Sequence, residues 1–187
     1  NDRVRSIETG PTLRRDQILI GFESVPLPWI AQVGGELVLG ERFDVANSRV
    51  GDGYYTNFNI KLRPGERYEV EYRIDESVIR AKEAVAGGNR ILNERAQRLL
   101  AVFHLSARDN VRLIYQSSFN KRAPSLWLTP VVAYDRQETV SLTYTHRRAL
   151  GTTFYAGLTA SDLREPDSVY RRRQLEIFAK ASYAFNL

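Results

Sequence analysis

Apolar and charged residues alternate without a break in the segment RYEVEYRID at positions 67–75. In an extended chain, Tyr68, Val70, Tyr72 and Ile74 point to one side and the charged residues between them point to the other. Half-buried strands of soluble proteins also alternate, but their outer side usually carries Thr, Ser and scattered charges. The unbroken charged row therefore predicts a strand with lipid on its apolar side and water on its charged side.

The same period of two recurs along the chain, with turn residues between the segments, and predicts nine strands. They cover residues 16–24, 31–41, 56–62, 67–75, 98–106, 110–117, 139–146, 152–161 and 176–187. This pattern predicts an all-β fold, an antiparallel up-and-down transmembrane β-barrel of about nine strands. We expect residues 1–187 to form a single transmembrane barrel segment with no separate soluble domain, and residues 1–12 to be an external lead-in.

Short connections alternate with long polar ones between the predicted strands. RPGE at 63–66 places Pro64 and Gly65 at the centre of a type II turn. The other short connections are 24–29, 107–110 and 149–152, and the long ones are 42–54, 80–95, 120–137 and 162–174. Bacterial outer-membrane barrels have short periplasmic turns and long outer loops. We therefore expect a bacterial outer-membrane location with the C-terminus in the periplasm.

Nine strands that start on the outer side do not make an even, single-chain barrel. Either RVRSIET at 3–9 is a weak tenth strand, or the residues belong to a larger barrel, and the poor alternation of RVRSIET favours the second. Unpaired strand edges are costly in lipid. Further strands, from the same polypeptide or from another chain, are thus expected at both sheet edges.

Two other features concern the organisation of the chain. Residues 76–100 permit a second interpretation, a short helix in an external loop, because they contain Ala-rich stretches around Gly87 and Gly88. The chain begins without Met or a signal peptide, so we expect a mature form or a fragment.

Composition narrows the function classes. The mean hydropathy is −0.38 and no run approaches the roughly 20 apolar residues of a membrane helix, which excludes a helical membrane protein and leaves a β-barrel open. The net charge of +5 comes from basic residues interleaved with acidic ones, so no nucleic-acid partner is expected. Cys is absent, which excludes disulfides and thiolate metal sites, and no cofactor or metal is expected.

Charged residues on the water-facing sides of the predicted strands are candidates for lining the lumen of a selective pore. They are Glu69, Glu71, Arg73, Asp75, Arg98, His104, Arg112, Glu176 and Lys180. Opposite charges could instead pair across neighbouring strands and fill the lumen. The even mixing of both signs favours this second interpretation.

Arginines in the last predicted external loop, Arg171, Arg172 and Arg173, are candidates for contacts with lipopolysaccharide phosphates, and a solvated loop is the alternative. Aromatic residues near both predicted strand ends, such as Trp29 and Tyr54, are typical of membrane interfaces.

The two histidines show no motif that pairs them. His104 falls on the lumen side of its strand, near Ser106 and Asp109 in the sequence, whereas His146 belongs to another strand. A hydrolase needs a nucleophile beside its base. We therefore expect no catalytic residues and no enzyme, and a barrel-embedded hydrolase remains an alternative.

The C-terminal segment KASYAFNL resembles the terminal assembly signal of outer-membrane barrels through Lys180, Ser182, Phe185 and Leu187. It differs from that signal in having Ser where Gly is common and Leu where Phe is common. Residues 50–187 also resemble the C-terminal strands of a large outer-membrane β-barrel family of unknown function, whose members often carry an N-terminal carbohydrate-binding β-sandwich. The resemblance implies no catalytic residues and a longer parent chain.

These patterns predict an outer-membrane β-barrel protein of a Gram-negative bacterium, acting as a porin-like pore or as a carbohydrate-linked uptake or anchoring component. Its expected partners are the lipid bilayer, lipopolysaccharide, the barrel-assembly machinery and further strands. A soluble lipid-binding β-barrel is a second alternative, and it would place the apolar faces inside.

Overall fold

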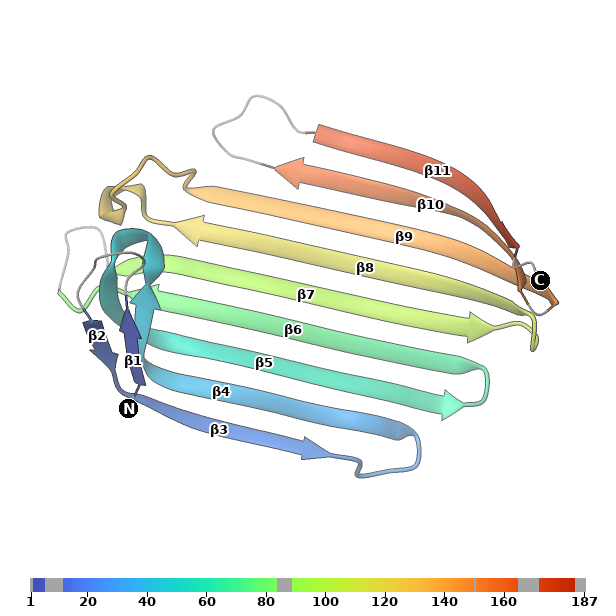
Figure 1. The fold of residues 1–187 in the computed structure, drawn as a ribbon, viewed down its shortest axis with the longest axis horizontal. Coiled ribbons are helices and arrows are strands. Elements are labelled where there is room, and N and C mark those ends of the chain that lie inside the picture. Colours follow the sequence, from blue (N-terminus) through green and yellow to red (C-terminus); the bar gives the residue numbers. More distant parts are fainter. Residues whose placement is uncertain (1, 6–11, 84–88, 150, 165–171, 184–187) are drawn as a thin grey trace.

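The computed structural model describes residues 2–5, 12–83, 89–149, 151–164 and 172–183. Nine strands form one antiparallel sheet in which each strand pairs with the next along the chain (Figure 1). They are β3 (Gln17–Ser24), β4 (Ile30–Asp44), β5 (Arg49–Gly65), β6 (Tyr68–Arg80), β7 (Arg90–His104), β8 (Asp109–Arg122), β9 (Tyr134–Ala149), β10 (Thr152–Arg164) and β11 (Arg172–Tyr183). The predicted all-β, up-and-down antiparallel fold is confirmed, and each predicted strand is present.

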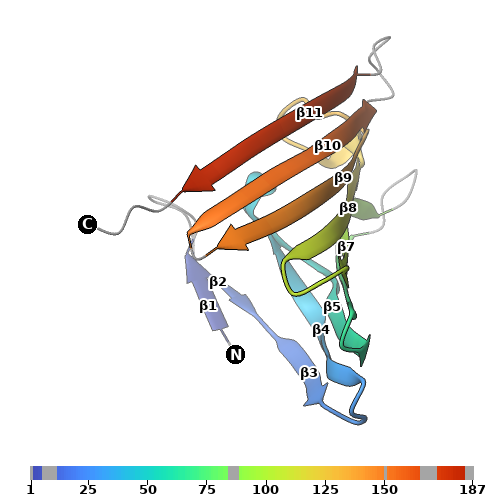
Figure 2. The ribbon, with the colours of Figure 1, turned by 90° about the vertical axis from the view of Figure 1, so that its right-hand side faces the viewer.

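The sheet is curved and open, with β3 and β11 as its two edges (Figure 2). A barrel closed by this chain alone would pair β3 with β11, and the described strands do not make that pair. Two further strands, β1 (Asp2–Arg5) and β2 (Thr12–Arg15), pair only with each other and lie near β4 and β5. The described part of RVRSIET therefore adds no tenth strand to the nine-stranded sheet.

Connections gather at two ends of the sheet because successive strands run in opposite directions (Figure 1). We call the end with the β3–β4, β5–β6, β7–β8 and β9–β10 connections the short-turn end. The opposite end, with the β4–β5, β6–β7, β8–β9 and β10–β11 connections, is the loop end. Both edge strands run from the loop end to the short-turn end.

One long connection was predicted wrongly. β4 continues to Asp44 and β5 begins at Arg49, so most of residues 42–54 pair in a ladder and only 45–48 connect the strands, with a 3-10 turn, η1 (Val45–Asn47). These strand ends carry polar residues and Gly, so the apolar alternation that marks strands elsewhere is missing. Gly53 allows the close approach of β6, since a Cβ there would lie 1.9 Å from the Val78 carbonyl oxygen.

The RPGE turn also differs from the prediction. Gly65 pairs with Tyr68, so Glu66 and Arg67 are the central turn residues, and Gly65 does not have the positive φ of a type II turn. A register shift separates Leu62 from Gly65, because two residues of β5 face one of β6. Pro64 has no N–H to donate to the ladder and lies in this bulge.

The helical interpretation of residues 76–100 is wrong where the structure describes them. β6 and β7 cover most of this range, and residues 84–88 lie outside the described residues. In the described part of the chain, no helix has the length and apolar character needed to cross a membrane.

The largest group of buried apolar residues lies at the loop end. Ile79 from β6 and Ile91 and Leu92 from β7 pack together, and Leu126 and Trp127 from the β8–β9 connection cover them. Ile91 is fully buried, with 0% of its surface exposed. The rest of the sheet is a single layer whose two faces remain largely open.

The backbone conformation at Gly40 can be tested by substitution. Its φ is 121°, and a Cβ there would lie 2.5 Å from the Asp16 carbonyl oxygen. We expect Gly40→Ala to lower the free energy of unfolding by about 1–3 kcal/mol, because an L-residue is strained in this conformation. The control is Gly21→Ala, whose Cβ would lie 3.6 Å from its nearest neighbour, the Gly35 carbonyl oxygen. Equal denaturation midpoints for the two variants would contradict the strain.

Candidate functional site: the polar face of the sheet

Directly opposite residues in an antiparallel pair share a face, so the register defines two faces of the sheet. We call one of them the polar face. Starting from Arg73, it passes through Arg98, Gln116, Thr139 and Ser161. The nine candidate lumen residues lie on this face: Glu69, Glu71, Arg73, Asp75, Arg98, His104, Arg112, Glu176 and Lys180.

The register brings these residues to one face without gathering them at one point. Arg73 and Arg98 are direct neighbours on β6 and β7. Glu176 and Lys180, in contrast, lie on the edge strand β11, three strands beyond β8. The polar face is therefore an extended wall rather than a compact site.

The opposite face, which we call the apolar face, carries a continuous apolar band near the short-turn end. One row across it contains Tyr68, Phe103, Val111, Tyr144 and Ala156. The rings of Tyr68 and Phe103 stack with centroids 4.9 Å apart. From Tyr68 along β6 to Ile74, six residues further, the band has a height of about 20 Å at about 3.4 Å per residue.

Charged residues replace apolar ones on the apolar face beyond this band. The row that begins at Glu76 on β6 continues through Arg95, Phe119, Arg136 and Arg164. The Arg95 guanidinium contacts the Glu76 carboxylate at 2.7 Å. The apolar surface thus ends at a defined height, on the side of the loop end.

Exposure of apolar side chains follows the same division. Ile177 on β11 is 79% exposed and Phe22 on β3 is 58% exposed. Among the described strand residues, every exposed large apolar side chain except Leu19 lies on the apolar face. The described part of the chain therefore leaves a large apolar surface uncovered on this face.

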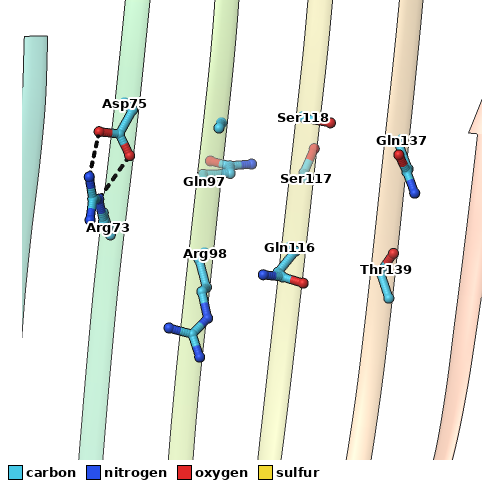
Figure 3. A pocket seen from close by; sticks show the side chains of 10 residues that line it. Arg73, Asp75, Gln97, Arg98, Gln116, Ser117, Ser118, Gln137 and Thr139 are labelled. Carbon is cyan, nitrogen blue, oxygen red and sulfur yellow. Dashed lines mark hydrogen bonds and ion pairs between the residues drawn. The ribbon is translucent and has the colours of Figure 1, made fainter.

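Several carboxylates of the polar face are paired. Glu69 accepts contacts from Lys61 Nζ and Arg63 Nε, each at 2.9 Å. Arg73 binds Asp75 through two nitrogens, at 2.9 and 3.0 Å (Figure 3). The contacts of Glu69 join the neighbouring strands β5 and β6, as the pairing interpretation expects, whereas Arg73 and Asp75 pair within β6.

A shallow groove of about 370 Å³ crosses the wall beside this pair. Arg98, Gln116, Gln137 and Thr139 line it, from three successive strands (Figure 3). The Arg98 side chain is 43% exposed, and its guanidinium lies 3.8 Å from Glu71, too far for a hydrogen bond. The groove therefore offers one weakly paired cation among neutral amide and hydroxyl groups.

The lipopolysaccharide candidates and the terminal signal are only partly described. Arg171 lies outside the described residues, and of Arg172 only its place in β11 is known. Arg173 is exposed on the apolar face, opposite Asp162 and beyond the apolar band. Lys180 and Ser182 lie on the polar face of β11, whereas Phe185 and Leu187 lie outside the described residues.

A polar cluster at the β7–β8 turn was missed at the level of sequence. Asp109 accepts hydrogen bonds from Ser106 Oγ at 2.6 Å and Tyr144 Oη at 2.5 Å, and it contacts His146 Nδ1 at 2.7 Å. Strand register contained the signal, since Asp109 lies directly opposite His146. Ser106 and His146 both bind the carboxylate rather than each other, so this geometry is not that of a nucleophile beside its base.

His104 lies on the polar face and His146 on the apolar face, so the two imidazoles cannot act as a pair. Among the described residues, no three His, Asp or Glu side chains are grouped so that they could hold a metal ion.

Comparison with known proteins adds no assignment to this geometry. The chain matches no family model, no curated protein and no solved structure. The resemblance to the outer-membrane family thus remains a prediction from the residues.

The hydrogen bonds at the β7–β8 turn lead to a prediction about the pKa of Asp109. This residue lies at the start of β8, outside the apolar band. Donation from Ser106, and then from Tyr144 and His146, holds the pKa of Asp109 well below its ordinary value of 3.8. We expect Ser106→Ala to raise this pKa toward 3.8, because the largest stabilisation of the carboxylate is lost. Carboxyl NMR titration measures the change, with Ser118→Ala on the same β8 strand as control. The same pKa in both variants would contradict the cluster.

Proposed function

We propose that the chain is part of a bacterial outer-membrane β-barrel whose apolar face meets lipid and whose polar face lines a water-filled passage. The observation that carries this proposal is that the exposed large apolar side chains of the described strands, Leu19 excepted, lie on one face. A sheet with a continuous exposed apolar band gains stability when lipid covers the band.

The dimensions and borders of the apolar band support the proposal. Its height of about 20 Å is close to the roughly 25 Å apolar band of outer-membrane barrels. At its loop-end border, Tyr72 and Tyr115 of the band donate their hydroxyls to Gln97 and Glu138 at 3.2 and 2.9 Å. Tyr54, which lies opposite Val78 beyond the band, donates its hydroxyl back to Glu76 at 2.8 Å. Rings in the apolar band with hydroxyls in a polar zone are typical of a membrane interface.

The chemistry of the polar face favours a porin-like passage for small polar solutes. Paired carboxylates and guanidiniums leave little net field along the wall, and the groove beside Arg98 offers neutral hydrogen-bonding groups. The three longer connections at the loop end favour a periplasmic position of the short-turn end. Arg173 then lies at the height of anionic lipid phosphates, and lipopolysaccharide is the corresponding partner.

The alternative functions have less support. A soluble lipid-binding barrel would need the apolar face inside, but the loop-end core and its covering connection lie on the polar face. A hydrolase would need an imidazole that accepts the proton of Ser106, whose hydroxyl instead donates to Asp109. The carbohydrate-linked role and the contact with the barrel-assembly machinery rest on the sequence resemblance alone.

Substitutions on adjacent residues of β6 test which face meets lipid. Val70→Arg is expected to weaken folding into lipid vesicles by about 2–4 kcal/mol if Val70 lies near the midplane, because a guanidinium would enter hydrocarbon. Glu71→Gln, on the polar face, is the matched control and should have a mild effect. Equal tolerance of the two changes in equilibrium vesicle-folding measurements would contradict the orientation.

Closure of the sheet makes a separate prediction. β3 and β11 run in the same direction, so pairing them directly would be parallel and would break the antiparallel order. We expect an odd number of further antiparallel strands between them, from the same polypeptide or from another chain. Mass spectrometry of the intact assembly should then give a mass well above 21.4 kDa. A closed barrel of this chain alone, with β3 bonded to β11, would refute it.

A further inference from the structure

The β8–β9 connection folds back over neighbouring strands instead of extending away from the sheet. We call residues 123–128, which include the 3-10 turn η2 (Pro124–Leu126), the strap. The Ala123 amide and the Trp127 indole both donate to the Ile91 carbonyl oxygen of β7, at 3.1 and 3.3 Å. Leu126 and Trp127 also cover the buried cluster of β6 and β7. The strap therefore crosses two strands from its origin at the end of β8.

The far side of the strap is fastened to the β4–β5 connection. The Leu128 amide donates to Asn47 Oδ1 at 2.8 Å, and Arg49 donates a guanidinium N–H to the Leu126 carbonyl oxygen at 2.6 Å. Asp44 holds both of these side chains, at 2.7 Å from Asn47 Nδ2 and 3.0 Å from Arg49 Nε. We call Asp44, Asn47 and Arg49 the latch.

Burial makes the latch a fixed structure. The Asp44 side chain is only 4% exposed, and Asn47 is buried as well. A buried carboxylate without its donors is costly, so opening the latch would leave Asp44 with an uncompensated charge. The strap is held at both ends, by Ile91 on one side and by the latch on the other.

The register shows which face the strap covers. Asp44 lies opposite Arg49, and Ile79 lies opposite Leu92. Every second residue of a strand lies on the same face, so Ile79 shares the polar face with Arg73, and Leu92 shares it with Arg98. In the end-on view, the β4–β5 and β8–β9 connections bend toward the concave side of the sheet (Figure 2). The strap thus crosses the concave, polar side at the loop end.

We infer that the strap, fastened by the latch, is the size filter of the passage lined by the polar face. This inference rests on the proposed function. Backbone and side chains that project from the wall reduce the open section at the loop end, where solutes would enter from outside. Leu128 on the strap and Val45 beside the latch are 78% and 61% exposed. Apolar groups at a constriction disfavour water and strengthen the barrier to polar solutes.

The test uses the full chain with any strands that complete its barrel, refolded in lipid vesicles. Asn47→Ala removes the acceptor of the Leu128 amide, and Asn110→Ala at the opposite end of β8 is the matched control. The hydrogen-exchange rate of the Leu128 amide shows whether its bond to the latch is intact. Swelling of the vesicles in uncharged polyethylene glycols of increasing size measures the largest solute that passes through the barrel. A second variant, Ser125→Trp, adds bulk to an exposed strap position without touching the latch.

In Asn47→Ala we expect exchange at Leu128 to be about fivefold faster or more, since one hydrogen bond is lost, and larger glycols to enter. Asn110→Ala should match wild type in both measurements, and Ser125→Trp should exclude glycols that wild type admits. Faster exchange with an unchanged size limit in Asn47→Ala, or an unchanged limit in Ser125→Trp, would overturn the filter. No glycol entry even in wild type would overturn the proposed passage, and the filter with it, while leaving the exchange result on the latch intact.

Discussion

A single sheet has no second layer to cover it, so the alternation of side chains decides the surroundings of almost every residue in this protein. The backbone ladder fixes each residue to one side, and a slip by one position would exchange the two sides completely. Most polar and most exposed apolar side chains therefore lie on opposite faces from β3 to β11, although Leu100, Val102 and Ile114 lie on the polar face. The apolar band, the paired charges of the wall and the groove beside Arg98 all follow from that one constraint.

The stability of such a sheet depends on what contacts its faces. In the described part of the chain few apolar side chains are buried, and most of them lie at the loop end. Elsewhere the hydrophobic contribution requires a covering medium, and the exposed residues of the edge strands require partners. The architecture is thus that of a component that needs further contacts to complete it, in line with the proposal that lipid and further strands cover its faces and edges.

The alternation of apolar and polar residues was enough to predict the nine strands. It also predicted on which face of its strand each candidate wall residue lies, because both predictions need only the local sequence. Alternation did not predict the strand ends around Gly51 and Gly53, because these segments lack alternating apolar residues. Their extended structure depends on pairing with the neighbouring strands. The Asp109 and His146 contact required the register of a second hairpin. The latch could not be predicted, since Asn47 and Leu128 are 81 positions apart and carry no shared motif.

That separation has a consequence for the order of folding. Each hairpin of the meander joins neighbouring segments, so it can form locally and early. The bond between Asn47 and Leu128 spans four strands, and it can form only after β5, β6, β7 and β8 have assembled in the correct register and curvature. A shift in any of them would displace Leu128 from its acceptor. The latch thus closes late, and its closure marks a correctly assembled central sheet.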